Sequence, residues 1–207
     1  MVVKDCNFSV QKGEMIGLMG ESGSGKSTLA KLLIGLEKPS QGQVLLDGQP
    51  YSVKKSGVRI LLVFQDSLHS VNPHFTVEQV LTEALPKDVA REEIEAILED
   101  VGLDKSYLTQ PARQLSGGQL QRICIARGLL LKPDILIFDE ALSGLDPIVQ
   151  GRLLRLLYDL WEKYQLTYLF ISHDFKLSYA LCHRILVMAD GEIVDEIKDF
   201  ELPIQAC

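Results

Sequence analysis

The residues with the clearest chemical meaning form a short polar segment between two apolar ones. This segment, Gly20-Glu-Ser-Gly-Ser-Gly-Lys-Ser27, has the spacing G-x-x-x-x-G-K-[ST]. Its glycines let the backbone curl so that successive N–H groups converge on an anion, and the helix expected to follow adds the positive end of its dipole. A glycine-rich turn that binds nothing is the alternative, but chance would give this spacing in only roughly one chain in a hundred of this length. The segment therefore predicts a phosphate-binding loop (P-loop).

The P-loop predicts a nucleotide and a magnesium ion as ligands. Lys26 would reach the β and γ phosphates, and the Ser27 hydroxyl is placed to hold Mg²⁺. A nucleotide with β and γ phosphates and Mg²⁺ are thus the expected ligands. The residues expected to bind them here are Gly20, Glu21, Ser22, Gly23, Ser24, Gly25, Lys26, Ser27 and Thr28.

Two acids and a histidine stand at the ends of apolar segments that predict buried strands. "DILIFDE" ends in Asp139 and Glu140, and "YLFISHD" places His173 after a similar run. Asp139 would accept the water shell of Mg²⁺, and Glu140 would polarise a water for attack on the γ-phosphate. His173 would contact that phosphate and orient the water. The alternative is a solvated strand end, which the P-loop upstream makes the weaker interpretation.

A second anion site is predicted at "LSGGQ", residues 115–119, called the signature segment below. Ser116 is a natural N-cap for the helix that follows, which we expect to be amphipathic. Gly117 and Gly118 leave backbone N–H groups open to an anion. Ordinary residue usage would produce five such specified residues by chance on the order of once in several thousand chains.

The remaining pattern predicts an α/β fold with a mainly parallel sheet. Apolar runs with strand character, several expected to be buried on both faces, lie at 15–19, 44–46, 59–64, 135–138 and 168–171. Strands that alternate with helical segments favour parallel pairing. Asp190-Gly191 between two apolar arms predicts an antiparallel hairpin near the end of the sheet.

The middle of the chain predicts a mostly helical lobe inserted into this core. Thr76, with Gln79 three residues later, has the spacing of a capping box. A second helix is expected with Asp88 as its N-cap and Gly102 as its stop. We therefore expect one domain over residues 1–207, in which 1–64 and 120–207 form the core and 65–119 form the helical lobe.

Composition excludes several other classes of protein. The chain has 207 residues, of which 46% are hydrophobic and 24% charged, as in ordinary soluble globular proteins. No apolar run approaches the ~20 residues that cross a bilayer, so a cytosolic chain is expected. The net charge of −7 and the lack of a basic stripe argue against nucleic acid as a partner. The four cysteines make no C-x-x-C, which predicts neither a zinc knuckle nor a disulfide framework.

The order of these motifs resembles that of the ATP-binding cassette (ABC) ATPases, a family of P-loop NTPases that power ABC transporters. The resemblance covers nearly the whole chain: Gln65 matches the Q-loop of the family, Asp146 its D-loop and His173 its switch histidine. "ESGSGKSTL", "VFQDSLHSVNPHFTV" and "EALSGLD" look most like the ATPases of oligopeptide, dipeptide and nickel importers. The resemblance implies a P-loop NTPase core with a mainly parallel sheet, antiparallel β elements and an inserted helical lobe.

The resemblance also implies a composite site between two subunits packed head to tail. In cis it assigns ATP contacts or catalysis to Lys26, Ser27, Gln65, Asp139, Glu140 and His173, with Ser27, Gln65 and Asp139 as the metal site. In trans it assigns the nucleotide of the partner to Ser116, Gly117, Gly118 and Gln119, with Asp146 lining the interface. Gln65 would report the γ-phosphate to the helical lobe.

The implied partners are a second ABC ATPase subunit, either a paralogue or a copy, and transmembrane permease subunits. An extracellular substrate-binding protein would take part indirectly, since cargo recognition lies outside this chain. The chain would then be peripheral at the cytoplasmic face of the cell membrane, and ATP hydrolysis would power uptake of peptide, nickel or metal-chelate cargo.

Two other classes stay open as alternatives. A soluble ABC ATPase of DNA repair or of the ribosome would usually show a long heptad insertion or a second cassette, and neither is present. An ATP-binding regulatory module with little turnover would not need Glu140 and His173. Adenine is a separate question, because the family usually stacks it on an aromatic residue upstream, whereas Met1 begins almost at "VVKDCNFSV". We expect either a truncated start or a base held without that contact; Tyr51 is a substitute or a packing residue.

Overall fold

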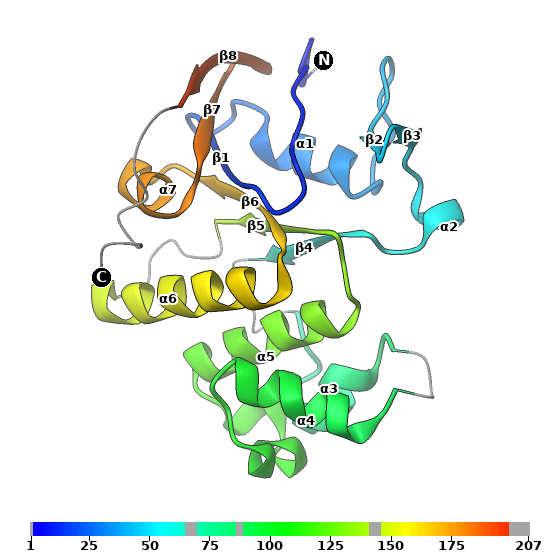
Figure 1. Cartoon of the computed structure of the whole chain (residues 1–207), viewed down its shortest axis with the longest axis vertical. Helices are drawn as coiled ribbons and strands as arrows, with labels where there is room; N and C mark the ends of the chain where they lie inside the picture. Colours follow the sequence, from blue (N-terminus) through cyan, green and yellow to red (C-terminus); the bar gives the residue numbers. More distant parts are fainter. Residues whose placement is uncertain (1, 65–69, 86–88, 141–145, 199–207) are drawn as a thin grey trace.

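A six-stranded sheet forms the centre of the molecule (Figure 1). The computed structural model describes residues 2–64, 70–85, 89–140 and 146–198. Within them the strand order is β4-β5-β6-β1-β7-β8, and neighbours are parallel except for β7 with β8. The strands are β1 (Met15–Met19), β4 (Ile60–Phe64), β5 (Ile135–Asp139), β6 (Thr167–Ser172), β7 (Arg184–Ala189) and β8 (Glu192–Ile197).

The predicted strands are confirmed, with ends that differ by at most one residue. All residues of β1 and β6 are buried, as expected for central parallel strands covered on both faces. The predicted hairpin is also present, because Asp190 and Gly191 both adopt positive φ between β7 and β8. The apolar run at 44–46 forms only β2 (Leu45–Leu46), which pairs with β3 (Gln49–Pro50) in a small separate sheet beside α2 (Val53–Ser56).

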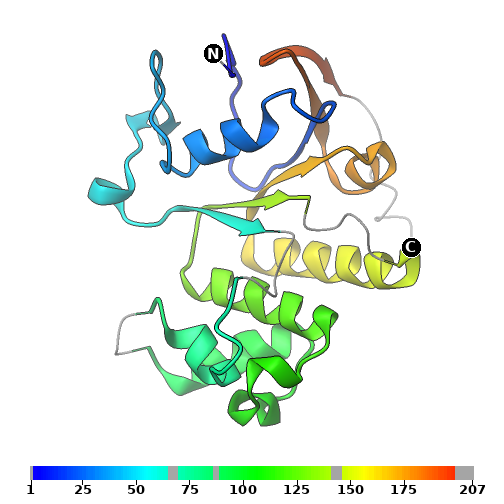
Figure 2. The same cartoon turned by 180° about the vertical axis from the view of Figure 1, so that it is seen from behind.

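Helices cover both faces of the large sheet (Figures 1 and 2). α1 (Lys26–Leu33) lies on one face, where Leu29 and Ala30 pack with Ile16 and Leu18 of β1. α5 (Gly117–Leu130) and α6 (Pro147–Tyr164) lie on the other face. α7 (Phe175–Leu181) contacts β1, β6 and β7, and Gly17 lets Ser178 of this helix approach β1 closely.

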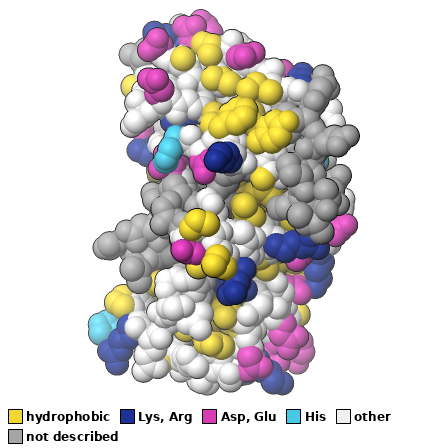
Figure 3. Space-filling model, turned by 90° about the vertical axis from the view of Figure 1, so that its left-hand side faces the viewer, with side chains coloured by type: hydrophobic (Ala, Val, Ile, Leu, Met, Phe, Trp, Pro, Cys, Tyr) yellow, Lys and Arg dark blue, Asp and Glu magenta, His cyan; other side chains and the backbone are white. Residues whose placement is uncertain are grey.

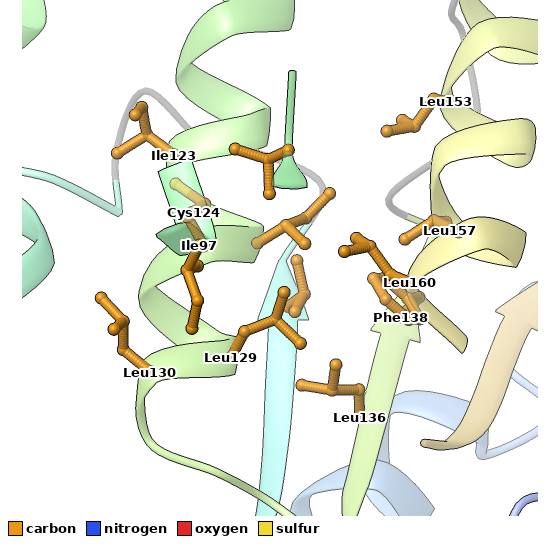
Figure 4. Packing of buried hydrophobic residues seen from close by; sticks show 14 of the residues in the cluster. Ile97, Ile123, Cys124, Leu129, Leu130, Leu136, Phe138, Leu153, Leu157 and Leu160 are labelled. Atoms are coloured by element: carbon orange, nitrogen blue, oxygen red, sulfur yellow. The ribbon is translucent and has the colours of Figure 1, made fainter. Parts of the chain in front are cut away.

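The core on the α5 and α6 face is aromatic at its centre. Phe138 stacks on Phe170 with ring centroids 5.0 Å apart, and the edge of Tyr168 meets Phe138 at 5.2 Å. The leucines of α5 and α6 pack side by side on these strand residues. Figure 4 labels Leu129 of α5, Leu136 of β5, and Leu153, Leu157 and Leu160 of α6. Such burial, at about 25 cal/mol per Å², is the main term that holds the helices on the sheet.

α5 is buried around most of its circumference, so the expectation of an amphipathic helix is wrong. One side lies against β4, where a Cβ added to Gly128 would come within 2.8 Å of the Leu61 side chain. The opposite side packs against α3 (Val77–Thr82) and α4 (Arg91–Asp100). A helix between a sheet and two other helices needs apolar residues on both sides, which removes the polar face.

The caps of the lobe helices follow the sequence in part. Thr76 and Gln79 form the predicted capping box of α3, and Gly102, with φ of +73°, ends α4 as expected. The N-cap of α4 is Ala90, not the predicted Asp88, which lies outside the described residues. Two short 3₁₀ turns, η1 (Lys105–Thr109) and η2 (Ala112–Gln114), then lead to α5.

No helix among the described residues has the length and apolar character that a bilayer crossing requires.

We expect Leu157→Ala to lower the free energy of unfolding by about 2–5 kcal/mol, because the fully buried leucine leaves a cavity between α6 and the sheet. Arg155→Ala on the exposed side of α6 is the control. It removes an exposed ion pair with Asp159 and a cation–π contact with the Tyr158 ring, so its effect should stay at about 1 kcal/mol. Urea unfolding of both variants tests the packing, and equal effects would contradict it.

Candidate nucleotide-binding site

The register of three parallel strands brings the predicted catalytic residues together. β1 pairs with β6, where Met19 lies opposite Ser172, and β6 pairs with β5, where Ile171 lies opposite Asp139. The P-loop follows β1, Asp139 is the last residue of β5, Glu140 comes directly after it, and His173 follows β6. Since parallel strands end at one edge of a sheet, these side chains meet there, where open α/β sheets bind ligands.

The P-loop has a backbone that only glycine fits. Gly23 and Gly25 have φ of +85° and +110°, and Gly25 is the N-cap of α1. A Cβ on Gly20 would lie 2.2 Å from the Met188 carbonyl oxygen, and one on Gly25 would lie 2.9 Å from the Val2 carbonyl oxygen. The loop therefore lies tightly against β7 and the N-terminal segment, with the free N–H groups of the first turn of α1 at its end.

Lys26 is folded back over the loop. Its Nζ donates to the carbonyl oxygens of Gly20, at 2.7 Å, and Glu21, at 2.8 Å, and the residue is only 7% exposed. A buried ammonium with two carbonyl partners holds the loop in shape. It also places a positive charge beside the amide groups at the start of α1, which suits a phosphate.

The side chains of Asp139 and Ser27 are hydrogen-bonded to each other near the lysine. Burial raises the pKa of Asp139 above its usual value, and the nearby Glu140 adds to this effect, whereas a hydrogen bond from Ser27 and the charge of Lys26 oppose it. Hydroxyl and carboxylate oxygens are what Mg²⁺ prefers, so the residues fit that ion. Among the described residues no cluster of three His, Cys, Asp or Glu side chains could hold a metal.

Glu140 and His173 contact each other at the edge of the sheet. His173 Nδ1 lies 3.2 Å from Glu140 Oε1, and His173 is 62% exposed, so water reaches the pair. Glu140 has a φ of +51°, an unfavourable conformation for a non-glycine residue, and its N–H donates to the Ile171 carbonyl at 2.9 Å. This backbone turn at Glu140 directs its carboxylate away from the strand direction of β5 and toward His173.

The signature segment forms the predicted cap of α5. Ser116 Oγ accepts from Gln119 N at 3.3 Å, and Gln119 Oε1 accepts from Ser116 N at 2.8 Å, which is a capping box. Neither Gly117 nor Gly118 has a positive φ, and a Cβ on either would meet nothing within 4 Å. The fold of the chain itself therefore gives no reason for glycine at these two positions.

The structure does not bring the signature segment to the P-loop. α1 and α5 lie on opposite faces of the sheet (Figures 1 and 2), and no hydrogen bond joins the two segments within the described part of the chain. Asp146 is the N-cap of α6, where its carboxylate accepts from Ile148 N at 2.9 Å. Gln65 lies outside the described residues.

Two tyrosines have clearer roles in the structure than in the sequence. The Tyr51 hydroxyl accepts from the Arg59 and Ile60 amides at 3.4 Å, and its ring packs on the core, which supports the packing interpretation. Tyr107 was not singled out from the sequence, yet its hydroxyl accepts from Gln119 Nε2 at 2.9 Å. No periodic or motif signal marks this contact, because it depends on how η1 turns before α5.

The fold and the edge residues together define a P-loop nucleotide-binding protein with an NTPase core. The model of the family described as ABC transporter matches residues 3–143. The chain therefore belongs to the ABC transporter family, and the predicted resemblance, fold class and ATPase activity are confirmed.

Similar proteins include metal importers. The chain is 42% identical over 206 residues to the nickel import ATP-binding protein NikE of Shigella dysenteriae, covering 94% of this chain and 77% of the relative. It is 40% identical over 203 residues to the metal-staphylopine import system ATP-binding protein CntF of Staphylococcus aureus, covering 95% and 82%.

Solved structures with the same fold include subunits of larger assemblies. CbiO1 of Clostridium perfringens, described as part of the ABC transporter complex cbiONQ, has a TM-score of 0.85 at 27% identity and covers 99% of this chain and 83% of its own. The cassette MJ0796, described as a dimer bound to ADP and Pi, has a TM-score of 0.78 at 27% identity and covers 95% and 90%.

We expect Asp139→Asn to raise the melting temperature of the nucleotide-free protein at pH 7.5. Because the pKa of Asp139 is raised in the folded state, its charged carboxylate lowers the stability of the fold. This loss of stability is absent at a pH below the unfolded-state pKa. It grows as the pH rises toward the folded-state pKa. Asparagine carries no charge and removes this loss of stability. Each 1 kcal/mol of stability gained raises the melting temperature by about 2–4 °C for a chain of this size.

Thermal melts of both proteins from pH 4 to pH 7.5 test this expectation. The gain should shrink toward pH 4. A variant that is less stable than the parent at pH 7.5, or a gain that does not change with pH, would show that burial is not the dominant effect on this group.

Proposed function

We propose that the chain hydrolyses ATP as one half of a head-to-tail dimer and powers an importer of nickel or of a metal chelate. The observation that carries the proposal is the meeting of Lys26, Asp139, Glu140 and His173 at one sheet edge, while the open glycines of the signature segment lie elsewhere. One chain thus has two anion-binding segments that its own fold keeps apart.

In cis, the P-loop would bind and orient the phosphates. Lys26 Nζ, which contacts two loop carbonyls, would exchange them for phosphate oxygens, and the N–H groups of the first turn of α1 would complete the cradle. Ser27 and Asp139, with Gln65, would hold Mg²⁺, which supplies neutralisation of phosphate charge.

Glu140 is the proposed general base. Its carboxylate would accept a proton from the water that attacks the γ-phosphate, and the contact between Glu140 Oε1 and His173 Nδ1 fixes the direction of the carboxylate. His173 also has the exposure to reach the γ-phosphate from the same edge.

In trans, the signature segment would close over the ATP of a second cassette. Ser116 is exposed, and Gly117 and Gly118 leave their backbone open to an approaching anion. Asp146 would line the same interface. The relation to a cassette described as dimeric supports this arrangement. Exposed apolar side chains on the side of α6 and α7 add surface for a protein partner (Figure 3); they are Ile148, Val149, Phe175 and Tyr179.

The membrane subunits would dock between the sheet and the helical lobe, residues 65–119. A pocket of about 270 Å³ lies there, lined by β4, α5 and the end of α3. Arg127 at the pocket donates to the Ser70 carbonyl at 3.0 Å and to Glu83 at 2.7 Å. Such an apolar groove with charged groups suits a cytoplasmic helix of a permease subunit. The chain would then be peripheral at the cytoplasmic face of the membrane, and the substrate-binding protein would act through the permease.

The cargo proposal rests on the relatives. NikE is named for nickel import and CntF for metal-staphylopine import, and both cover nearly the whole of this chain. Metal or metal-chelate uptake is therefore favoured over peptide uptake.

Lys26→Ala should weaken binding of Mg-ATP at least about tenfold, because a charge-assisted contact with phosphate is lost. Lys38→Ala is the control, since Lys38 is exposed and lies beyond the C-terminal end of α1. Calorimetric titration of both variants tests the role of Lys26; equal affinities would refute it.

Glu140→Gln should bind Mg-ATP, hydrolyse it about 10²–10⁴-fold more slowly and accumulate as closed dimer, because the amide cannot accept the proton. ATPase rate against protein concentration should rise faster than linearly for the parent chain, and sizing columns with Mg-ATP should show the variant as a dimer.

Glu162→Gln on the exposed side of α6 is the control and should behave as the parent. If the chain alone binds ATP but does not hydrolyse it, the same measurements are repeated after co-expression with a paralogous cassette. A variant that stays monomeric alone and with that cassette would refute the composite site.

A further inference from the structure

Both ends of the Gln119 carboxamide are bound within the chain. Oε1 accepts from Ser116 N at 2.8 Å, and Nε2 donates to the Tyr107 hydroxyl at 2.9 Å. The backbone N–H of Gln119 in turn reaches Ser116 Oγ at 3.3 Å. Gln119 is thus a link between η1 and the cap of α5, and reaching a nucleotide on another subunit would break one of these bonds.

The two bonds of the carboxamide depend on each other. Ser116 N can only donate, so it selects the orientation in which Oε1 faces the cap; Nε2 is then left for the Tyr107 hydroxyl, which accepts from it. Without the hydroxyl, the carboxamide keeps its bond to Ser116 N but loses its second attachment, so the reciprocal cap is held less rigidly. Tyr107 therefore acts on Ser116 through Gln119.

The Tyr107 hydroxyl is held in place by its own turn. Asp104 caps η1 by accepting from Ser106 N at 2.8 Å, and Leu108, only 1% exposed, anchors the turn in the core. The Tyr107 ring is half-buried against the same cluster. Since η1 also packs on α3 and α4, the hydroxyl links the lobe to the signature segment.

We propose that Tyr107 is a positioning residue for the signature segment. By fixing Gln119, it aims the Ser116 hydroxyl and the N–H groups of Gly117 and Gly118 outward at the nucleotide of the facing cassette. The Ser116 oxygen accepts from Gln119 N, which leaves its own hydrogen to donate to a phosphate oxygen. The inference rests on the composite site proposed above, and it makes Gln119 a support for the clamp instead of a direct contact.

The test is Tyr107→Phe, in the parent chain and in Glu140→Gln. Phenylalanine keeps the packing of the ring and removes only the hydroxyl. Dissociation of the ATP-bound Glu140→Gln dimer, formed with itself or with the paralogous cassette, should become about three- to tenfold more favourable. In the parent background kcat should fall by a similar factor, while Mg-ATP binding by the monomer stays unchanged.

Two comparisons separate this role from general loosening. Tyr168→Phe is the matched control, because it also removes a hydroxyl that joins two elements, β6 and α6 through the Leu157 carbonyl, and neither element carries the signature segment or η1. It should leave dimerisation unchanged. In a double-mutant cycle, Tyr107→Phe should add nothing to Gln119→Ala if the tyrosine acts through the glutamine.

Unchanged dimerisation and kcat in Tyr107→Phe would overturn the inference while leaving the composite site intact. Weaker ATP binding by the monomer, or additive effects in the cycle, would also overturn it. If Glu140→Gln forms no dimer in either arrangement, the composite site and this inference fail together.

Discussion

The parallel register of β1, β6 and β5 is the constraint on which the site depends. It places the ends of three strands at one edge, so that a loop, two carboxylates and a histidine from distant parts of the chain meet. Each segment alone is ambiguous, because two acids after a strand are usually just solvated. The sheet is in turn fixed by its covering helices: apolar residues fill both faces, and a slip by one position would turn every side chain to the wrong layer.

The site carries charges where burial makes them unfavourable, and this ties function to stability. Lys26 is buried with loop carbonyls as partners, and burial raises the pKa of Asp139 beside it. Glu140, next to Asp139, has a positive φ, which is an unfavourable backbone conformation for a residue other than glycine. Phosphate and a metal ion, the ligands proposed for these groups, would compensate the charges that the fold has partly desolvated.

α5 connects the signature segment, the helical lobe and the central sheet. Its first turn displays the signature segment, its middle packs against α3 and α4 of the helical lobe, and its last turns lie against β4. The ion pair of Lys163 with Asp100, at 2.5 Å, adds a second link between α6 and the lobe. A shift of the lobe would therefore move the signature segment, so events at the sheet edge and at a docked membrane subunit would be coupled mechanically.

The sequence by itself determined the P-loop, the acids after β5, the histidine after β6, the Ser116 cap and the parallel sheet. These features are local: spacing and hydrophobic period encode them within a few residues. Tertiary structure alone decided that α5 is buried on both sides, that Ala90 and not Asp88 begins α4, and that Gln119 is held by Tyr107. Those outcomes depend on contacts between separate elements, and the direction of a hydroxyl or of a carboxamide leaves no periodic trace in a single sequence.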